Sequence, residues 1–160
     1  MADSKQDALI EAVDTALIGT LENMAFAEVV PLRKVPDCEF VDELNVYSVI
    51  DLIEPRAGRA VLILSKQLAE SITESIYGMF EDGELGPDHQ RDAVNEILNT
   101  LTGRLCVEMF GEDTIYNLGI PEFGMLAEKA EFQDPSSSWI QIDYSVEGWL
   151  LRVLIDTTLS

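Results

Sequence analysis

Two polar side chains near the start of the second half of the chain are spaced so that they could act together on a bound molecule. Asp92, Glu96, Asn99 and Gly103 follow one another at i, i+4, i+7 and i+11, which places them on one narrow stripe if the segment is helical. The carboxamide of Asn99 offers both donors and an acceptor, so it could orient a water molecule. The carboxylate of Glu96 could accept hydrogen bonds from a cationic group on a partner.

Gly103 adds a second feature to this stripe. It would leave bare backbone beside the polar side chains, which another molecule could approach closely. Glycine inside a helix destabilises it by about 1 kcal/mol relative to alanine, so a glycine at such a position usually serves a packing or binding purpose. The alternative interpretation is a solvated helix face that carries ordinary polar residues, and spacing alone does not decide between the two.

The helix that would carry the stripe is expected over roughly His89 to Phe110, with Asp88 as its N-cap. Apolar residues recur on the opposite face, and we expect that face to be buried, which leaves the stripe toward solvent. His89 is the only histidine, so the sequence offers little choice of residues for a Ser/His or Cys/His catalytic pair. We expect the His89 ring to be solvated. The apolar face consists of Val94, Ile97, Leu98, Leu101 and Leu105.

The remaining elements follow from periodicity and from turn residues. Helical spacing predicts a first helix that Ser4 caps and that runs to about Met24. Two β-hairpins are expected, and Ser65 and Gly78 should begin and end a short helix after the first of them. The hairpins cover Tyr47–Leu64 and Trp139–Asp156, the short helix covers Gln67–Tyr77, and an extended segment covers 118–127.

The chain contains an internal repeat with an offset of 85 residues. When residues 92–100 are placed over residues 7–15, four of the nine positions are identical, and each copy precedes extended segments and a hairpin. We therefore predict an α/β fold in two layers, with one antiparallel sheet, long helices and a pseudo-two-fold axis. Residues 1–160 should form a single domain made of two related halves, about 1–80 and 81–160.

Composition excludes several classes of function. The 160 residues are 47 % hydrophobic, which is enough for a core, and they carry 30 acidic against 10 basic side chains, a net charge of −20. This charge argues against nucleic acid and anionic membranes as partners. No apolar stretch of about 18 residues exists, and the N-terminus does not look like a signal peptide, so the cytoplasm is the expected compartment. Cys38 and Cys106 lack CxxC spacing, which predicts buried thiols and no metal site.

The stripe also resembles a known family. Asp92-x₃-Glu96-x₂-Asn99 is followed by 21 residues and then Pro121, which is similar to the Asp/Ser-x₃-Glu-x₂-Asn pattern and later proline of the CheC/CheX/FliY phosphatases of bacterial chemotaxis. The spacer before the proline is one residue shorter than in that family. The internal repeat, the strand-to-helix step at Ser65 and the helix stop at Gly78 extend the resemblance over most of the chain.

Within that family the sequence looks most like CheX. CheC-like chains usually carry the motif in both halves, whereas here the first copy consists of Asp7, Glu11 and Asp14. Asp14 stands where the motif has asparagine, so it lacks the amide donor and would add negative charge beside a phosphoryl group. We therefore interpret the first copy as degenerate and expect one site per chain.

The resemblance implies an activity, a partner and roles for three residues. Members dephosphorylate the phospho-aspartate of CheY-type response regulators, and the regulator supplies the Mg²⁺, so no cofactor or metal of this chain is expected. Asn99 would orient the attacking water, Glu96 would engage the regulator's lysine, and Asp92 would lie in the partner interface. Gly103 is also expected in that interface, because of its bare backbone. The resemblance also implies a homodimer. Two alternatives stay open: a non-catalytic CheX-like scaffold in chemotaxis or another two-component pathway, and an unrelated acidic α/β dimer.

Overall fold

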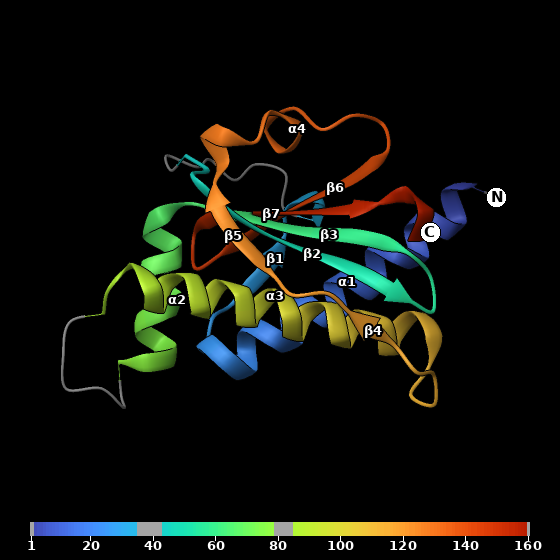
Figure 1. Ribbon diagram of the computed structural model, residues 1–160, viewed down its shortest axis with the longest axis horizontal. Coiled ribbons are helices and arrows are strands. Elements are labelled where there is room, and N and C mark those ends of the chain that lie inside the picture. The colour runs from blue at the N-terminus through green and yellow to red at the C-terminus, as the bar shows by residue number, and fades with distance from the viewer. Residues whose placement is uncertain (1, 35–42, 79–84, 160) are drawn as a thin grey trace.

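Seven strands form one sheet in the order β1-β6-β7-β3-β2-β4, and β5 pairs with β2 beside β4. Every strand pair is antiparallel (Figure 1). The computed structural model describes residues 2–34, 43–78 and 85–159. The strands are β1 (Val29–Pro31), β2 (Val46–Glu54), β3 (Gly58–Leu64), β4 (Asn117–Leu118), β5 (Glu122–Met125), β6 (Trp139–Val146) and β7 (Trp149–Asp156).

The three longest helices gather on one face of this sheet, and a short helix lies on the other (Figure 1). In the first group, α3 packs against both α1 and α2, and it also contacts β2 and β3. The helices are α1 (Ala2–Ala25), α2 (Lys66–Tyr77), α3 (Pro87–Phe110) and α4 (Ala130–Gln133), with 3₁₀ turns η1 (Leu32–Lys34), η2 (Leu126–Glu128) and η3 (Thr157–Leu159). The prediction of an antiparallel sheet with long helices is confirmed.

The strand order has the symmetry that the sequence repeat predicts. Exchanging the two halves replaces β1, β2 and β3 by β5, β6 and β7, and the order β1-β6-β7-β3-β2-β5 then reads the same from the opposite edge. The central strands β3 and β7 place Leu62 opposite Val153. Helices α1 and α3 both have 24 residues, and their first and last residues are each 85 positions apart. The sheet therefore interleaves strands of both halves instead of dividing between them.

Local capping signals are confirmed at α2 and corrected at the two long helices. Ser65 caps α2, since its hydroxyl accepts a hydrogen bond from the backbone N–H of Leu68 at 3.0 Å. Helix α1 begins at Ala2, two residues before Ser4, so Ser4 is not its N-cap. The ends of the predicted hairpins are close to those observed, although β5 and β4 occupy only part of the extended segment 118–127.

The start of α3 differs from the prediction for a physical reason. Gly86 is its N-cap and Pro87 its first residue, because the fixed φ of proline suits the first turn of a helix. Asp88 lies inside the first turn instead of capping it. His89 is half-buried rather than solvated: its Nδ1 accepts a hydrogen bond from the Gly86 N–H at 3.2 Å, and its ring contacts Tyr77 edge-on.

Hydrophobic packing occurs on both faces of the sheet. The larger cluster lies between the sheet and the three long helices and contains the whole predicted apolar face of α3. A smaller cluster on the far face was not predicted. It contains Tyr47 and Phe132, whose rings meet edge-on at 5.2 Å, and it lies beneath η2 and α4. The fold is thus two layers with a small cover on the outer face.

Of the two cysteines, the structure describes Cys106. Cys106 is buried on α3, and burial raises the pKa of its thiol to about 11. Cys38 lies outside the described residues. None of the helices within the described ranges has the length and apolar character needed to cross a membrane.

Candidate functional site

The predicted stripe on α3 borders a shallow hollow of about 580 Å³ on the surface. Asp92 and Glu96 are exposed and Asn99 is half-buried, so all three side chains are reachable from solvent, as the amphipathic pattern predicts. Segment 119–121, between β4 and β5, forms the opposite wall. The hollow is lined by Tyr77, Asp92, Asn95, Glu96, Asn99, Gly119, Ile120 and Pro121.

The polar side chains of the stripe are held to different degrees. Asp92 accepts a hydrogen bond from Arg91 at 3.3 Å, so part of its charge is compensated. Glu96 accepts a longer one from the Thr100 hydroxyl at 3.4 Å. Asn99 has no hydrogen-bond partner within the described residues, so its amide and carbonyl groups are available to a bound water or phosphoryl group.

Pro121 reaches the stripe despite the shortened spacer. Gly119 donates its N–H to the carbonyl of Asp51 on β2 at 2.8 Å, which fixes the segment at the sheet edge. From there the chain passes alongside α3 and brings Ile120 and Pro121 against the hollow. Ile120 is 88 % exposed, so an apolar side chain stands in solvent at the rim of a polar site.

Gly103 does not line this hollow. It borders a neighbouring one with Asn99 and Tyr116, further along α3. A Cβ placed on Gly103 would lie 3.5 Å from the Tyr116 hydroxyl, an ordinary van der Waals distance. Its bare backbone therefore faces a side chain of the same chain, and glycine is not sterically required there.

Asn95 and Tyr77 are members of the hollow that sequence reasoning missed. Asn95 lies one turn before Asn99, so its position on the helix could have suggested it. The hydroxyl of Ser48, a buried residue of β2, donates a hydrogen bond to its Oδ1 at 2.6 Å. Tyr77 is the last residue of α2, and only the packing of α2 against α3 brings it to the hollow.

The first copy of the motif has a different environment. Asp14 is only 4 % exposed, and it accepts hydrogen bonds from the Tyr144 hydroxyl at 2.7 Å and from Arg33. Burial, and then the hydrogen bond to Asp14, raise the pKa of Tyr144 far above its usual value. The hydrogen bond to Asp14 raises the pKa of Arg33. Asp14 thus joins α1 to η1 and β6, and it is a structural residue instead of a surface remnant of a second site.

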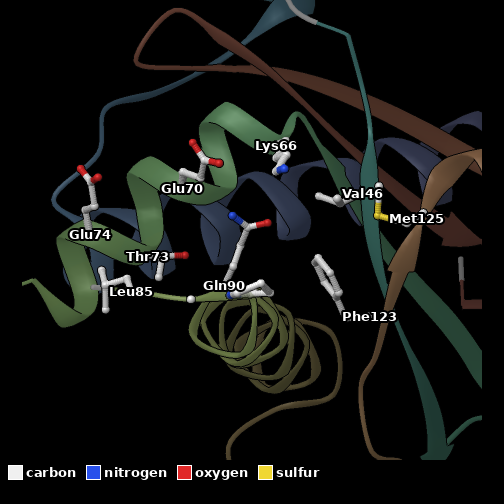
Figure 2. A pocket seen from close by; sticks show the side chains of 11 residues that line it. Val46, Lys66, Glu70, Thr73, Glu74, Leu85, Gln90, Phe123 and Met125 are labelled. Carbon is white, nitrogen blue, oxygen red and sulfur yellow. The ribbon is translucent and has the colours of Figure 1, made fainter. Parts of the chain in front are cut away.

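A separate cavity of about 420 Å³ lies between α2, the start of α3, β2 and β5, and none of the stripe residues lines it. Figure 2 shows Lys66, Glu70 and Glu74 along α2, with Phe123 and Met125 on the opposite side and the Gln90 side chain between them. The side chains that line this cavity thus include one amine, two carboxylates and several apolar groups. Over the described residues, no three His, Cys, Asp or Glu side chains are grouped so that they could hold a metal ion.

Comparison with known proteins connects this arrangement to one family. The sequence matches the family model described as chemotaxis phosphatase CheX over residues 46–138, more than half of the 160 residues. The chain belongs to the CheX family. The match spans α3, the hollow and segment 119–121, so the resemblance predicted from the stripe is confirmed at the level of the family. No curated protein matches the sequence.

Solved structures share the fold of this CheX-family chain. A chemotaxis protein from Desulfovibrio vulgaris Hildenborough superposes with a TM-score of 0.69 at 16 % identity, covering 92 % of this chain and 94 % of that one. CheX from Vibrio vulnificus gives 0.66 at 17 %, covering 92 % and 95 %. The CheX of a CheX–CheY–BeF₃–Mg²⁺ complex from Borrelia burgdorferi gives 0.63 at 15 %, covering 92 % and 96 %.

Proposed function

We propose that this CheX-family protein dephosphorylates the phospho-aspartate of a CheY-type response regulator at the hollow on α3. The observation that carries the proposal is the convergence of Glu96, Asn99 and Pro121 on one solvent-accessible hollow. Helical spacing alone relates Glu96 to Asn99, whereas the fold brings Pro121, the later proline of the pattern, to the same hollow. That a family relative forms a complex with CheY, BeF₃ and Mg²⁺ supports a response regulator as the partner.

The proposed roles follow from the chemistry of each side chain. Asn99, whose carboxamide is not engaged elsewhere, holds the attacking water in line with the acyl phosphate. Glu96 accepts hydrogen bonds from the lysine of the regulator's site and fixes the docked orientation. Phosphoryl transfer depends on positioning and on charge stabilisation more than on covalent help, so the helix needs no nucleophile of its own. The Mg²⁺ of the regulator supplies the charge compensation at the phosphoryl group.

The partner contacts extend beyond these two residues. Asp92 lies at the hollow's edge and contacts the regulator there, whereas Gly103 lies further along the same helix face and belongs to the outer interface. We further propose a homodimer acting in the cytoplasm, as the sequence resemblance implies. The alternative is a CheX-like scaffold that binds the regulator without turnover.

One assay separates the phosphatase from the scaffold. The purified protein is mixed with a CheY-type regulator phosphorylated in the presence of Mg²⁺, and phosphate release is followed against the regulator's own decay. The phosphatase predicts faster release in proportion to the protein added. Binding of the phosphorylated regulator without faster release would establish the scaffold instead.

A further inference from the structure

The second carboxamide of the hollow, Asn95, has an orientation that the sheet beneath it imposes. Its Oδ1 accepts the hydrogen bond from Ser48, whose side chain is completely buried on β2. A carboxamide is planar, with its oxygen and nitrogen on opposite sides, so fixing Oδ1 on the strand turns Nδ2 the other way. Asn95 lines the hollow, and within the described residues its Nδ2 has no hydrogen-bond partner. Ser48 therefore holds an amide donor toward the site.

The charges of the lining residues indicate which kind of ligand group the Asn95 donor could bind. Its lining includes the two carboxylates of Asp92 and Glu96 and neither lysine nor arginine. The N–H of Gly119 is already bound to the Asp51 carbonyl. An anionic phosphoryl group that enters this acidic hollow needs neutral donors from the protein, since charged ones are not among the lining residues. Asn95 and Asn99, one helical turn apart, present two such carboxamides on the same side of α3.

We propose that Asn95 is a further catalytic residue of this site, whose Nδ2 donates a hydrogen bond to a phosphoryl oxygen of the bound phospho-aspartate. This rests on the proposed phosphatase or regulator-binding function. The two carboxamides then divide the work: Asn99 holds the water and Asn95 holds the group that the water attacks. Ser48 is a positioning residue that acts through Asn95 and does not touch the substrate.

A purely structural interpretation makes a different prediction. If the Ser48–Asn95 hydrogen bond only ties α3 to β2, its loss weakens the docked complex to the same degree whether or not the regulator carries a phosphoryl group. If Nδ2 contacts the phosphoryl oxygen, the loss falls on the loaded regulator alone. The ratio of the two affinities therefore separates the interpretations, and a general loss of stability leaves that ratio unchanged.

The experiment measures binding to a CheY-type regulator with Mg²⁺, in the presence and absence of beryllofluoride as the phosphoryl mimic. Wild type is compared with Asn95→Ala, Asn95→Asp and Ser48→Ala. Asn23→Ala is the matched control, because Asn23 is an exposed asparagine of α1 whose amide, among the described residues, donates only to the Gly19 carbonyl. Phosphate release from the phosphorylated regulator is measured beside binding, and far-UV circular dichroism confirms folding.

We expect Asn95→Ala to weaken binding of the beryllofluoride form roughly 10- to 100-fold, as for a hydrogen bond to a charged group, and to leave the unloaded form unchanged. Asn95→Asp loses the donor and adds a negative charge, so its loss should be larger. Ser48→Ala releases the amide to rotate and should give a smaller loss. Asn23→Ala should match wild type in both forms.

Two results would overturn the inference. Equal weakening of the loaded and unloaded forms by Asn95→Ala makes Asn95 structural, and an unchanged ratio with unchanged affinities makes it a bystander. Failure of the proposed function has a separate signature, because wild type itself would then neither prefer the loaded regulator nor release phosphate. If wild type prefers the loaded form without turnover, the affinity ratio still tests Asn95.

Discussion

At the residue scale, the two motif side chains of the proposed site, Glu96 and Asn99, make few contacts with the rest of the protein. Asn99 and Glu96 lie on the solvent side of α3, while the residues on the opposite face form the core. Function and stability can therefore be separated by mutation here, which is not possible at a buried catalytic group. The same helix carries both properties because its period places the two sets on opposite faces.

Asn99→Ala should abolish most of the activity and little of the stability. Its side chain has no hydrogen-bond partner within the described ranges, so the free energy of unfolding should change by about 0.5 kcal/mol or less. Misplacing a reacting group by about 1 Å can cost roughly 10²-fold in rate, and loss of the group that orients the water should cost at least that. Single-turnover decay of the phosphorylated regulator and urea unfolding measure the two effects. Decay at the wild-type rate would refute the proposed mechanism.

Glu96→Ala should differ from Asn99→Ala in kind. Glu96 is proposed to bind a cationic side chain of the regulator, so its loss should weaken the docked complex as well as turnover. Among the described residues, the single polar contact of Glu96 is the long hydrogen bond from Thr100, so its loss should not cause a folding defect. A binding titration with the beryllofluoride-loaded regulator shows the difference. Wild-type affinity combined with slow turnover would assign Glu96 to the chemical step instead of to docking.

At the scale of single elements, the two long helices place their copies of the motif in different environments. Helix α3 presents its motif to solvent, whereas α1 turns Asp14 inward to Tyr144 and Arg33. The inward position explains why a carboxylate can replace the motif's asparagine there. It also means that Asp14 cannot serve as a neutral probe of a lost second site.

Asp14→Ala should destabilise the fold by about 2–4 kcal/mol, since it leaves the buried Tyr144 hydroxyl and the half-exposed Arg33 without their acceptor. Glu11→Ala is the matched variant on the same helix. The Glu11 side chain is 70 % exposed, and its ion pair with Arg33 is long, with 3.8 Å between the nearest atoms. Glu11→Ala should leave both the unfolding midpoint and phosphate release close to wild type. A large loss of activity in folded Glu11→Ala would show that the first copy still works.

Cys106 should be chemically silent in the native protein. Burial raises the pKa of its thiol to about 11, so below that pH the group stays in the unreactive neutral form. In a Cys38→Ser variant, labelling by a thiol reagent at pH 8 should be as slow as unfolding and should accelerate in urea. Rapid labelling under native conditions would mean that α3 separates readily from the core.

At the scale of the whole molecule, the sheet leaves strands at both of its edges. β1 is the strand at one edge and β4 and β5 are the strands at the other, where β2 is their only partner among the described strands. Open edges present unpaired backbone groups that favour pairing with another strand. The homodimer that the resemblance implies would cover one of these edges.

Light scattering at micromolar concentration should therefore give about twice the 17.8 kDa mass of one chain. Asn99→Ala should not change this mass, because the Asn99 side chain lies on α3 and takes no part in the backbone pairing of an edge strand. A mass of one chain for wild type would contradict the homodimer and would leave the phosphatase proposal intact.

The sequence by itself determined the features that depend on neighbouring residues: helix faces, helix caps and tight turns. Helical period fixed the stripe and its buried opposite face, and Ser65 fixed the start of α2 through its own side chain. The turn at Glu147 and Gly148 was predictable, and both residues adopt the positive φ that a tight hairpin requires. The repeat was visible because the two long helices kept the same length and offset.

Only the tertiary structure decided which distant segments meet at the site. Ser48 and Asn95 are 47 positions apart, and Asp14 and Tyr144 are 130 apart, so no local period relates them. Their contacts depend on the order of strands in the sheet, which places β2 beneath α3 and β6 beneath α1. The same packing brought Pro121 to the stripe despite its short spacer and covered the far face with Phe132. Side-chain spacing therefore located the chemistry, whereas the interleaved sheet determined its surroundings.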